Sequence, residues 1–426
     1  KSRIKAVREK FQDRNYFFNI ICNIINLQYL PLNSISEGKK YSFVWQNSLR
    51  ECSVFIENFI EIKNDDIKRM VEGCETKIDG YFVIFSPFTK NVNFVKDLNN
   101  NFKSPYLSTI LFWSPKTPTE EEIDFVETYC AKYVLQEEFP VLSVELKSKE
   151  SELKELITKL YFEGEIVYGN GQTENNLSNI GYLPFERLLS YLFENSFNAL
   201  YPKHNLVMSK IDYFTTTHLK SLFTSFIKIG KISIEESEKK GLTSYIKGIM
   251  EPLGIVKKKS GSYFLSLESD NELVSLLLNL CSNENNIFNI RLSLKKGVYG
   301  LSDDQFNLLT LSAIAVGFLQ PFQNDNVCEI KDYNDIYNTN ILRSGKTLSS
   351  ELLPYLKNGD FIWGEVEDIP TPATRNEMWK KTQTLIRKSR EILEEIKLFS
   401  TRYQGYSVMN KMNINYNILN KLNNLF

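Results

Sequence analysis

The residues best suited to chemistry in this sequence are lysines, and they gather near its middle. Between Lys228 and Lys259 the chain has eight lysines and four glutamates, whereas the net charge of the whole chain is -1. A local cluster of ammonium groups suits phosphate contacts, while the near-neutral total gives no global attraction to nucleic acid. The candidate nucleic-acid-binding residues, three on a predicted helix and three on a predicted hairpin, are Thr243, Ser244, Lys247, Lys257, Lys258 and Lys259.

Few other residues are suited to catalysis. His204 and His218 are the two histidines of the sequence, and neither belongs to an H-x-x-x-H pair. No G-x-S-x-G nucleophile motif is present. Residues 343–347 invite comparison with a phosphate loop, but the Walker pattern requires glycine where this chain has Asn340. The sequence therefore predicts no catalytic residue and no metal site, and a stand-alone hydrolase is disfavoured.

The candidate lysines lie within residues 214–267, which are typical of three short helices followed by a hairpin. Apolar residues recur at helical spacing from Leu219 to Ile227. Ser233 and Glu236 form a capping box that opens a second helix, and a third helix follows. Residues 255–267 form two strands around a Ser-Gly-Ser turn. This order of elements predicts a winged helix, whose third helix meets the major groove and whose hairpin meets the backbone.

The hairpin lysines also have a structural explanation. Lysines on an exposed strand edge protect it from pairing with another chain, and many winged helices bind proteins. Contact with a duplex and a solvated hairpin edge therefore both remain open.

Residues 271–331 repeat the same order of elements. An apolar helix at 273–280 precedes a second helix with a capping box at Ser302 and Gln305. Residues 318–330 then predict a second hairpin. The pattern indicates a second, degenerate winged-helix-like unit.

The remaining parts of the chain differ in pattern. Two apolar runs at 81–85 and 109–113 each end in Ser-Pro and predict a parallel sheet covered on both faces. Residues beyond Asp332 are predicted to be helical, at 348–356, from a Thr374 cap to about 399, and at 407–425.

The predicted fold class is an α/β N-terminal part plus a mostly helical remainder with winged-helix-like central units. A chain of 426 residues is long for one core. The predicted domains are an α/β domain at 1–145, a helical connector at 146–213, winged-helix-like units at 214–270 and 271–331, and a helical region at 332–426.

The composition indicates in which cellular compartment the protein is expected. The six cysteines are scattered singly, which favours reduced thiols in a cytoplasmic protein over a disulfide or zinc framework. No stretch approaches about 18 uninterrupted apolar residues, so we expect no membrane contact. Because the chain begins at Lys1 and not at Met, we expect it to be part of a longer protein.

Several short motifs carry a resemblance to a known family. The motifs, in chain order, are Ile110-Leu111-Phe112-Trp113-Ser114-Pro115, Thr119-Glu120-Glu121-Glu122, Tyr161-Phe162-Glu163-Gly164, Leu200-Tyr201-Pro202-Lys203-His204 and Gly300-Leu301-Ser302. They resemble segments of the large bacterial phage-defence ATPases of the BREX BrxC/PglY type, over roughly residues 81–322.

This resemblance implies a P-loop ATPase core, winged-helix-like units and a role in restricting foreign DNA. The Walker A loop is absent from this chain, so ATP hydrolysis is not carried over to any residue. No cofactor is expected here, and ATP with Mg²⁺ is expected only if a P-loop precedes the chain in the longer protein.

The predicted function is therefore that of a non-catalytic module of a bacterial anti-phage defence ATPase. The predicted partners are double-stranded DNA, other defence-system proteins and further copies in a homo-oligomer, with no membrane. The alternative is a structural interaction or oligomerisation scaffold, which the near-neutral charge and the long C-terminal helices favour.

Overall fold

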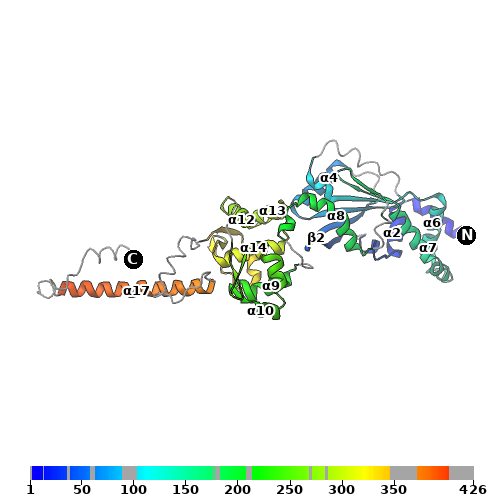
Figure 1. Cartoon of the computed structure of the whole chain (residues 1–426). Helices are drawn as coiled ribbons and strands as arrows, with labels where there is room; N and C mark the ends of the chain where they lie inside the picture. Colours follow the sequence, from blue (N-terminus) through cyan, green and yellow to red (C-terminus); the bar gives the residue numbers. More distant parts are fainter. Residues whose placement is uncertain are drawn as a thin grey trace. The chain divides into compact units, whose positions relative to one another are not determined.

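A computed structural model describes most of the chain, in two compact units (Figure 1). Unit 1 comprises Lys1–Thr215 with Arg291–Phe306, and unit 2 comprises Thr216–Ile290 with Asn307–Phe426. The described residues are 2–12, 14–35, 39–57, 63–88, 103–175, 177, 183–207, 214–267, 271–283, 286–345 and 372–402. The helices predicted at 348–356 and 407–425 lie outside these residues, and the bounds of the five predicted domains stay predictions.

Unit 1 is built on a six-stranded mixed sheet in which the strands follow one another in chain order. Its strands are β1 (Lys39–Trp45), β2 (Ser48–Glu57), β3 (Gly80–Phe85), β4 (Ile110–Ser114), β5 (Glu165–Tyr168) and β6 (Thr173–Asn175). Strands β2, β3 and β4 are parallel, whereas β1 pairs antiparallel with β2, β5 with β4, and β6 with β5. The prediction of a buried parallel pair at β3 and β4 is confirmed, within a sheet that is mixed as a whole.

The two faces of this sheet are covered by separate cores. Phe82 of β3 and Trp113 of β4 lie in one core, whereas Val83 and Phe112 lie in the other. Alternate residues of a strand point to opposite faces, so a strand buried on both faces reads as a continuous apolar run. The predicted double covering is therefore confirmed for β3 and β4.

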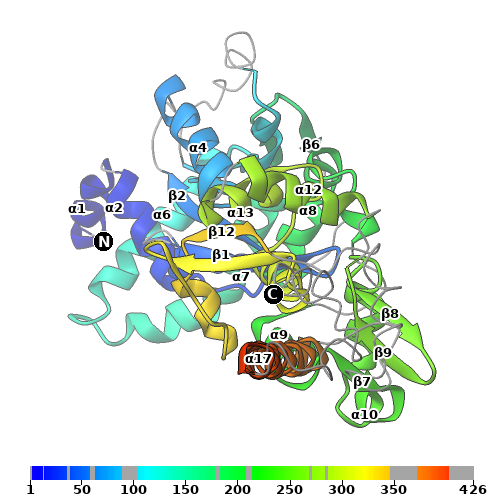
Figure 2. The ribbon, with the colours of Figure 1, turned by 90° about the vertical axis from the view of Figure 1, so that its left-hand side faces the viewer.

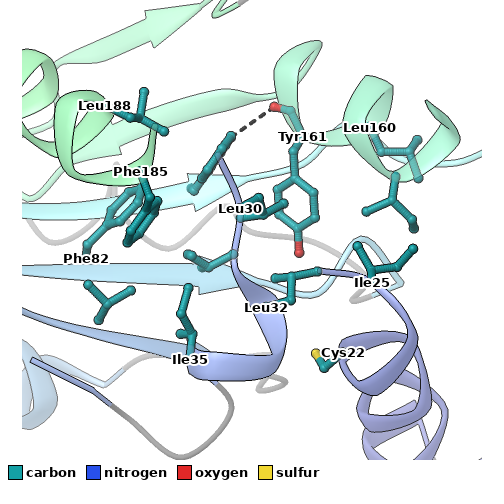
Figure 3. Close-up of a cluster of buried hydrophobic side chains, with 14 of the residues drawn as sticks. Cys22, Ile25, Leu30, Leu32, Ile35, Phe82, Leu160, Tyr161, Phe185 and Leu188 are labelled. Atoms are coloured by element: carbon teal, nitrogen blue, oxygen red, sulfur yellow. Dashed lines mark hydrogen bonds between the residues drawn. The ribbon is translucent and has the colours of Figure 1, made fainter. Parts of the chain in front are cut away.

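Helices of unit 1 supply these cores. They are α1 (Ser2–Glu9), α2 (Arg14–Ile24), α3 (Leu32–Ile35), α4 (Asn64–Thr76), α6 (Glu120–Leu135), α7 (Leu142–Phe162) and α8 (Phe185–Leu200). Cys22 and Ile25 from the α2 region, Tyr161 of α7 and Phe185 of α8 converge in the larger core (Figure 3). Helix α6 begins with a capping box, because Thr119 and Glu122 exchange side-chain to backbone hydrogen bonds. Residues 147–155 belong to α7.

The first part of unit 2 contains the predicted hairpin. Helix α9 (Thr216–Leu222) continues into the π-helical turn η5 (Phe223–Ile227), and strand β7 (Lys231–Ser233) precedes helix α10 (Ile234–Lys239). Helix α11 (Thr243–Tyr245) continues into a second π-helical turn, η6 (Ile246–Met250). Strands β8 (Val256–Lys259) and β9 (Ser262–Leu265) then pair antiparallel, so the predicted hairpin at 255–267 is confirmed.

A third strand completes this small sheet. Strand β7 pairs with β9, which gives the order β7-β9-β8, and α10 follows directly from the end of β7 (Figure 2). The three-residue segment of β7 was not expected from the sequence. Its Lys-Ile-Ser alternation, with only Ile232 buried, is the signal of a short half-buried strand.

The second part of unit 2 also contains a hairpin, but its third strand comes from a different place. Helices α12 (Glu272–Asn283), α13 (Ile287–Lys296) and α14 (Asp303–Val316) precede strands β10 (Leu319–Gln323) and β11 (Asn326–Val327), and the end of α13 and the start of α14 belong to unit 1. Strand β12 (Ile341–Ser344) pairs with β10 and gives the order β11-β10-β12. The predicted helical structure directly beyond Asp332 is wrong, because a 3-10 helix, η7 (Tyr333–Asn338), and β12 lie there.

The chain beyond β12 contains one long described helix. Helix α17 (Pro372–Arg402) has 31 residues and begins before the predicted cap at Thr374. At the coarse level the predicted fold class is therefore confirmed, since an N-terminal sheet with helices is followed by a mostly helical remainder.

Candidate nucleic-acid interface

The turn between β8 and β9 positions the three hairpin lysines. Ser260 and Gly261 at its centre have φ angles of 47° and 75°. Positive φ at both central residues matches the right-handed twist of the flanking strands and permits a tight two-residue turn. Lys257, Lys258 and Lys259 on the strand before this turn are all exposed.

The strand register separates these lysines between the two faces of the sheet. Lys257 lies opposite Phe264, and Lys258 lies opposite the buried Tyr263. Residues directly opposite each other share a face, and neighbours along a strand alternate. Lys257 and Lys259 therefore lie on one face of the sheet, and Lys258 lies on the other.

A further lysine joins the first of these faces. Lys231 of β7 lies opposite Phe264 on the other side from Lys257, and its ammonium is 4.9 Å from the centroid of the Phe264 ring. Lys231, Lys257 and Lys259 make up what we call the lysine face. The sequence analysis did not select Lys231, because β7 was not expected.

Two of the three candidate residues on the third helix are exposed. Ser244 and Lys247 lie three positions apart and reach solvent, whereas Thr243 is half-buried. The Thr243 hydroxyl lies 2.7 Å from the Ser237 hydroxyl, which donates to the carbonyl of Ile234. Thr243 therefore donates to Ser237 and joins α11 to α10, in a contact that the sequence did not indicate.

Other lysines of the cluster interact within unit 2. Lys239 and Lys240 form ion pairs with Glu235 and Glu236, each at 2.7 Å and one helical turn apart. Lys228 donates to the backbone carbonyl of Lys331. Lys228, Lys239 and Lys240 are therefore engaged in contacts within unit 2.

His218 has a structural position. Its ring stacks on that of Tyr245 with centroids 4.2 Å apart, and its Nε2 lies 2.9 Å from the Tyr245 hydroxyl. This contact joins α9 to α11 and fixes the start of the helix that carries Ser244 and Lys247.

His204 lies in unit 1, in a buried chain of hydrogen bonds. Its Nδ1 is 2.7 Å from the Tyr299 carbonyl and its Nε2 is 2.8 Å from the Ser48 hydroxyl. Because a carbonyl only accepts, Nδ1 carries the hydrogen and Nε2 accepts from Ser48, whose oxygen in turn accepts from Gln305. A serine beside an imidazole resembles an activated nucleophile, but Ser48 is 1% exposed and His204 is fully buried.

Burial also sets the charge of His204. Removal from water and, to a smaller extent, the neighbouring Arg50 guanidinium lower the pKa of His204 to about 4. The imidazole is therefore neutral at neutral pH. A closed, neutral and fully bonded pair is suited to holding the fold together and does not present a nucleophile to a substrate.

The same region of unit 1 contains a buried charge cluster, formed by Arg50, Asp79 and Lys296. Asp79 Oδ1 lies 3.7 Å from Arg50 Nη1 and 3.6 Å from Lys296 Nζ, and all three side chains are at most 8% exposed. The guanidinium donates to the carbonyl of Gly300. Burial opposes ionisation of Asp79, but Arg50 and then Lys296 outweigh it and lower the pKa of that carboxyl.

Aromatic rings surround this cluster. The Arg50 guanidinium carbon is 5.0 Å from the Trp45 ring centroid and 5.2 Å from that of Tyr201. A Cβ atom at Gly300, where φ is +53°, would come within 2.4 Å of Tyr201. The short motifs at 200–204 and 300–302, which are about a hundred residues apart, therefore meet inside unit 1 and depend on glycine at their contact.

Other candidate sites gain no geometric support among the described residues. In those parts of the chain no group of three His, Cys, Asp or Glu side chains could hold a metal ion, and no helix is long and apolar enough to cross a membrane. Arg343 and Ser344 of the phosphate-loop candidate lie on β12, whereas Lys346 and Thr347 fall outside the described residues.

In comparisons with known proteins, the chain matches no family model, no curated protein and no solved structure.

Proposed function

We propose that residues 214–267 form a winged-helix-like unit that contacts the backbone of duplex DNA and acts as a non-catalytic module of a larger system. The observation that carries the proposal is the exposure of three consecutive lysines on the hairpin β8–β9. The order of elements, with β7 between the first two helices and the sheet order β7-β9-β8, supports the winged-helix assignment.

The roles of the individual residues follow from their positions. Lys257 and Lys259, together with Lys231, present ammonium groups on one face of the sheet, where they would neutralise phosphates. Ser244 and Lys247 are exposed on the third helix, which in a winged helix enters the major groove. Thr243 supports that helix through Ser237.

Backbone contacts of this kind predict weak sequence preference and strong salt dependence. Each phosphate neutralised by a lysine adds about 0.9 to the slope of log affinity against log salt concentration. A fluorescence anisotropy titration of the full chain with a random-sequence duplex, repeated over a range of salt concentrations, measures both quantities. The triple substitution Lys257→Glu, Lys258→Glu and Lys259→Glu is expected to weaken binding at least tenfold and to reduce the salt slope by about 2–3.

A matched control separates this effect from net charge. Lys68, Lys147 and Lys149 are exposed lysines of unit 1, and their replacement by glutamate changes the net charge by the same amount. This control variant is expected to bind nearly as the wild type does. Equal affinity and equal salt slope for the hairpin variant and the wild type would remove the DNA proposal.

The larger system that we propose is a bacterial anti-phage defence ATPase. This part of the proposal is supported by the ordered short motifs in the sequence and by their resemblance to the BREX BrxC/PglY type. The test is the plating efficiency of phage on cells with the intact gene, with the gene deleted and with the hairpin variant. Equal plating on all three would argue against a defence role, and it would leave the DNA titration to stand by itself.

A further inference from the structure

Residues 291–306 form the tip of a helical hairpin, and we call them the docking tip. The tip comprises the end of α13, the connection at 297–302 and the start of α14. The chain on either side of the docking tip belongs to unit 2, whereas the tip itself belongs to unit 1. Unit 1 is therefore completed by a segment that reaches it from within the sequence of unit 2.

The docking tip has contacts of its own that hold its shape. The backbone N–H of Leu301 donates to the carbonyl of Leu294 at 3.2 Å. The guanidinium carbon of Arg291 lies 5.0 Å from the ring centroid of Phe306, which joins the first residue of the tip to its last. Because these contacts link the two helices directly, the docking tip can keep its shape when it is separated from the rest of unit 1.

Polar contacts join the docking tip to the rest of unit 1. They include hydrogen bonds of Lys296 Nζ to the Ile78 carbonyl (2.8 Å), of the Tyr106 hydroxyl to the Lys296 carbonyl (3.1 Å), of the Lys203 N–H to the Val298 carbonyl (3.1 Å), of His204 Nδ1 to the Tyr299 carbonyl (2.7 Å) and of Gln305 Nε2 to the Ser48 hydroxyl (3.0 Å). Neither of the two cores that cover the sheet has a described member from the docking tip. Hydrogen bonds of this kind can be exchanged for hydrogen bonds to water at a modest net cost.

The buried charge cluster lies where the docking tip meets the rest of unit 1, since Lys296 and Gly300 belong to the tip. Among the described residues, the buried polar atoms without a hydrogen-bond partner include Arg50 Nε and Nη1, Asp79 Oδ1 and Tyr201 Oη. Charged and polar groups that are kept from water without full pairing are costly. Undocking of the tip returns these groups to water together, which offsets part of the contacts that are lost.

We propose that the docking tip is a latch that undocks from unit 1 as one piece while the sheet and its two cores stay folded. The chain passes between the units at 215–216, 290–291 and 306–307. The docked tip holds the second and third of these passages on unit 1, and undocking leaves the first. The latch therefore sets how many chain connections tether the two units. The proposal is independent of DNA binding, because the docking tip lies outside residues 214–267.

A buried thiol placed under the docking tip tests the undocking. The substitution Ser48→Cys introduces it at a position that is 1% exposed and in contact with Gln305. Cys52, also on β2 and buried in the larger core, is the native reference. The full chain is labelled with N-ethylmaleimide under native conditions, and peptide mapping by mass spectrometry gives both rates. We expect position 48 to react at least about a hundredfold faster than Cys52, because undocking exposes the first thiol alone. Equal rates would overturn the proposal.

A second substitution in the Ser48→Cys background weakens the docking itself. In Gly300→Ala the new Cβ would come within 2.4 Å of the Tyr201 ring, at a φ of +53°. Labelling at position 48 is expected to become at least about tenfold faster, while the rate at Cys52 stays the same.

The matched control for this substitution is Gly241→Ala. Gly241 also has a positive φ, +66°, but a Cβ there would meet nothing within 4 Å, and the residue lies in unit 2. Both labelling rates should therefore stay as they are in the parent. An unchanged rate at position 48 in Gly300→Ala, or an equal acceleration at Cys52, would contradict a latch that moves separately from the sheet.

Discussion

Each unit of this protein gathers positive charge, and the two gatherings differ in burial. In unit 1, Arg50 and Lys296 lie inside the protein around Asp79. In unit 2, Lys257, Lys258 and Lys259 lie on an exposed hairpin. A buried cation must be neutralised by the protein itself, because its removal from water is costly, whereas an exposed cation keeps its hydration and can exchange it for a phosphate. Burial thus separates charge that acts on the fold from charge that can act on a ligand.

The largest effect should come from breaking the buried charge cluster. Replacing Arg50 by Met leaves Asp79 buried with one cation fewer and removes the donor to the Gly300 carbonyl. Removing one partner of a buried pair costs about 3–5 kcal/mol. Amide hydrogen exchange in β2 and β3 measures this loss locally.

An exposed lysine of unit 2 supplies the control for the replacement of Arg50. Lys257→Met on the exposed hairpin is expected to change stability by less than about 0.5 kcal/mol. Similar exchange in β2 and β3 for the Arg50 variant and the wild type would show that the buried cluster does not hold unit 1 together.

A somewhat smaller effect should appear in the pH dependence of stability. Burial lowers the pKa of His204 from 6.5 to about 4, so between these values the unfolded chain binds more protons than the native protein. Stability from this group is therefore fully present above pH 6.5 and is lost as the pH falls toward 4. The difference corresponds to about 3 kcal/mol, at about 1.4 kcal/mol for each pKa unit.

Denaturant unfolding of wild type and His204→Gln between pH 7 and pH 4 measures this contribution. The wild type should lose more stability across the window than the variant does, because other titrating groups are common to both. Parallel pH profiles would mean that His204 titrates normally in the native state.

The smallest effect should distinguish a residue that stabilises the third helix, Thr243, from a residue that is proposed to contact DNA, Ser244. Thr243→Val removes the hydroxyl that donates to Ser237 and should destabilise the α10–α11 pair by about 1 kcal/mol. Ser244→Ala, one residue further along, should leave stability unchanged and weaken DNA binding two- to threefold. Amide exchange rates in α10 measure the change in stability, and the anisotropy titration measures the change in DNA affinity. Loss of DNA affinity in Thr243→Val without loss of stability would indicate that Thr243 contacts DNA directly.

Local patterns in the sequence predict the elements but not the long-range contacts. The hairpin at 255–267 and the capping box at Ser302 are confirmed, because turns and caps depend on neighbouring residues. The 3-10 helix and strand beyond Asp332 were missed, since the pairing of β12 with β10 is decided by a partner about twenty residues away. The π-helical turns η5 and η6 share the apolar spacing of an α-helix, and both segments were therefore predicted to be α-helical.

The candidate site was predicted in the same uneven way. Lys257, Lys258 and Lys259 are exposed as expected because a charged run on a hairpin has a local signature. Lys231 was missed because its position depends on the pairing of β7 with β9. The buried charge cluster gave no signal at all, since Arg50, Asp79 and Lys296 are brought together from three distant parts of the chain.

The placement of residues 291–306 in unit 1 has a consequence for how the protein is made. Until this segment leaves the ribosome, Arg50 has no Gly300 carbonyl to bind and Asp79 has no Lys296 beside it. At about 5–20 residues per second, the roughly ninety residues between Thr215 and Phe306 take roughly 5–18 s to synthesise. During that interval unit 1 is incomplete, because residues 291–306 are still missing from it. Chaperone binding to the nascent chain would therefore be most useful in this interval.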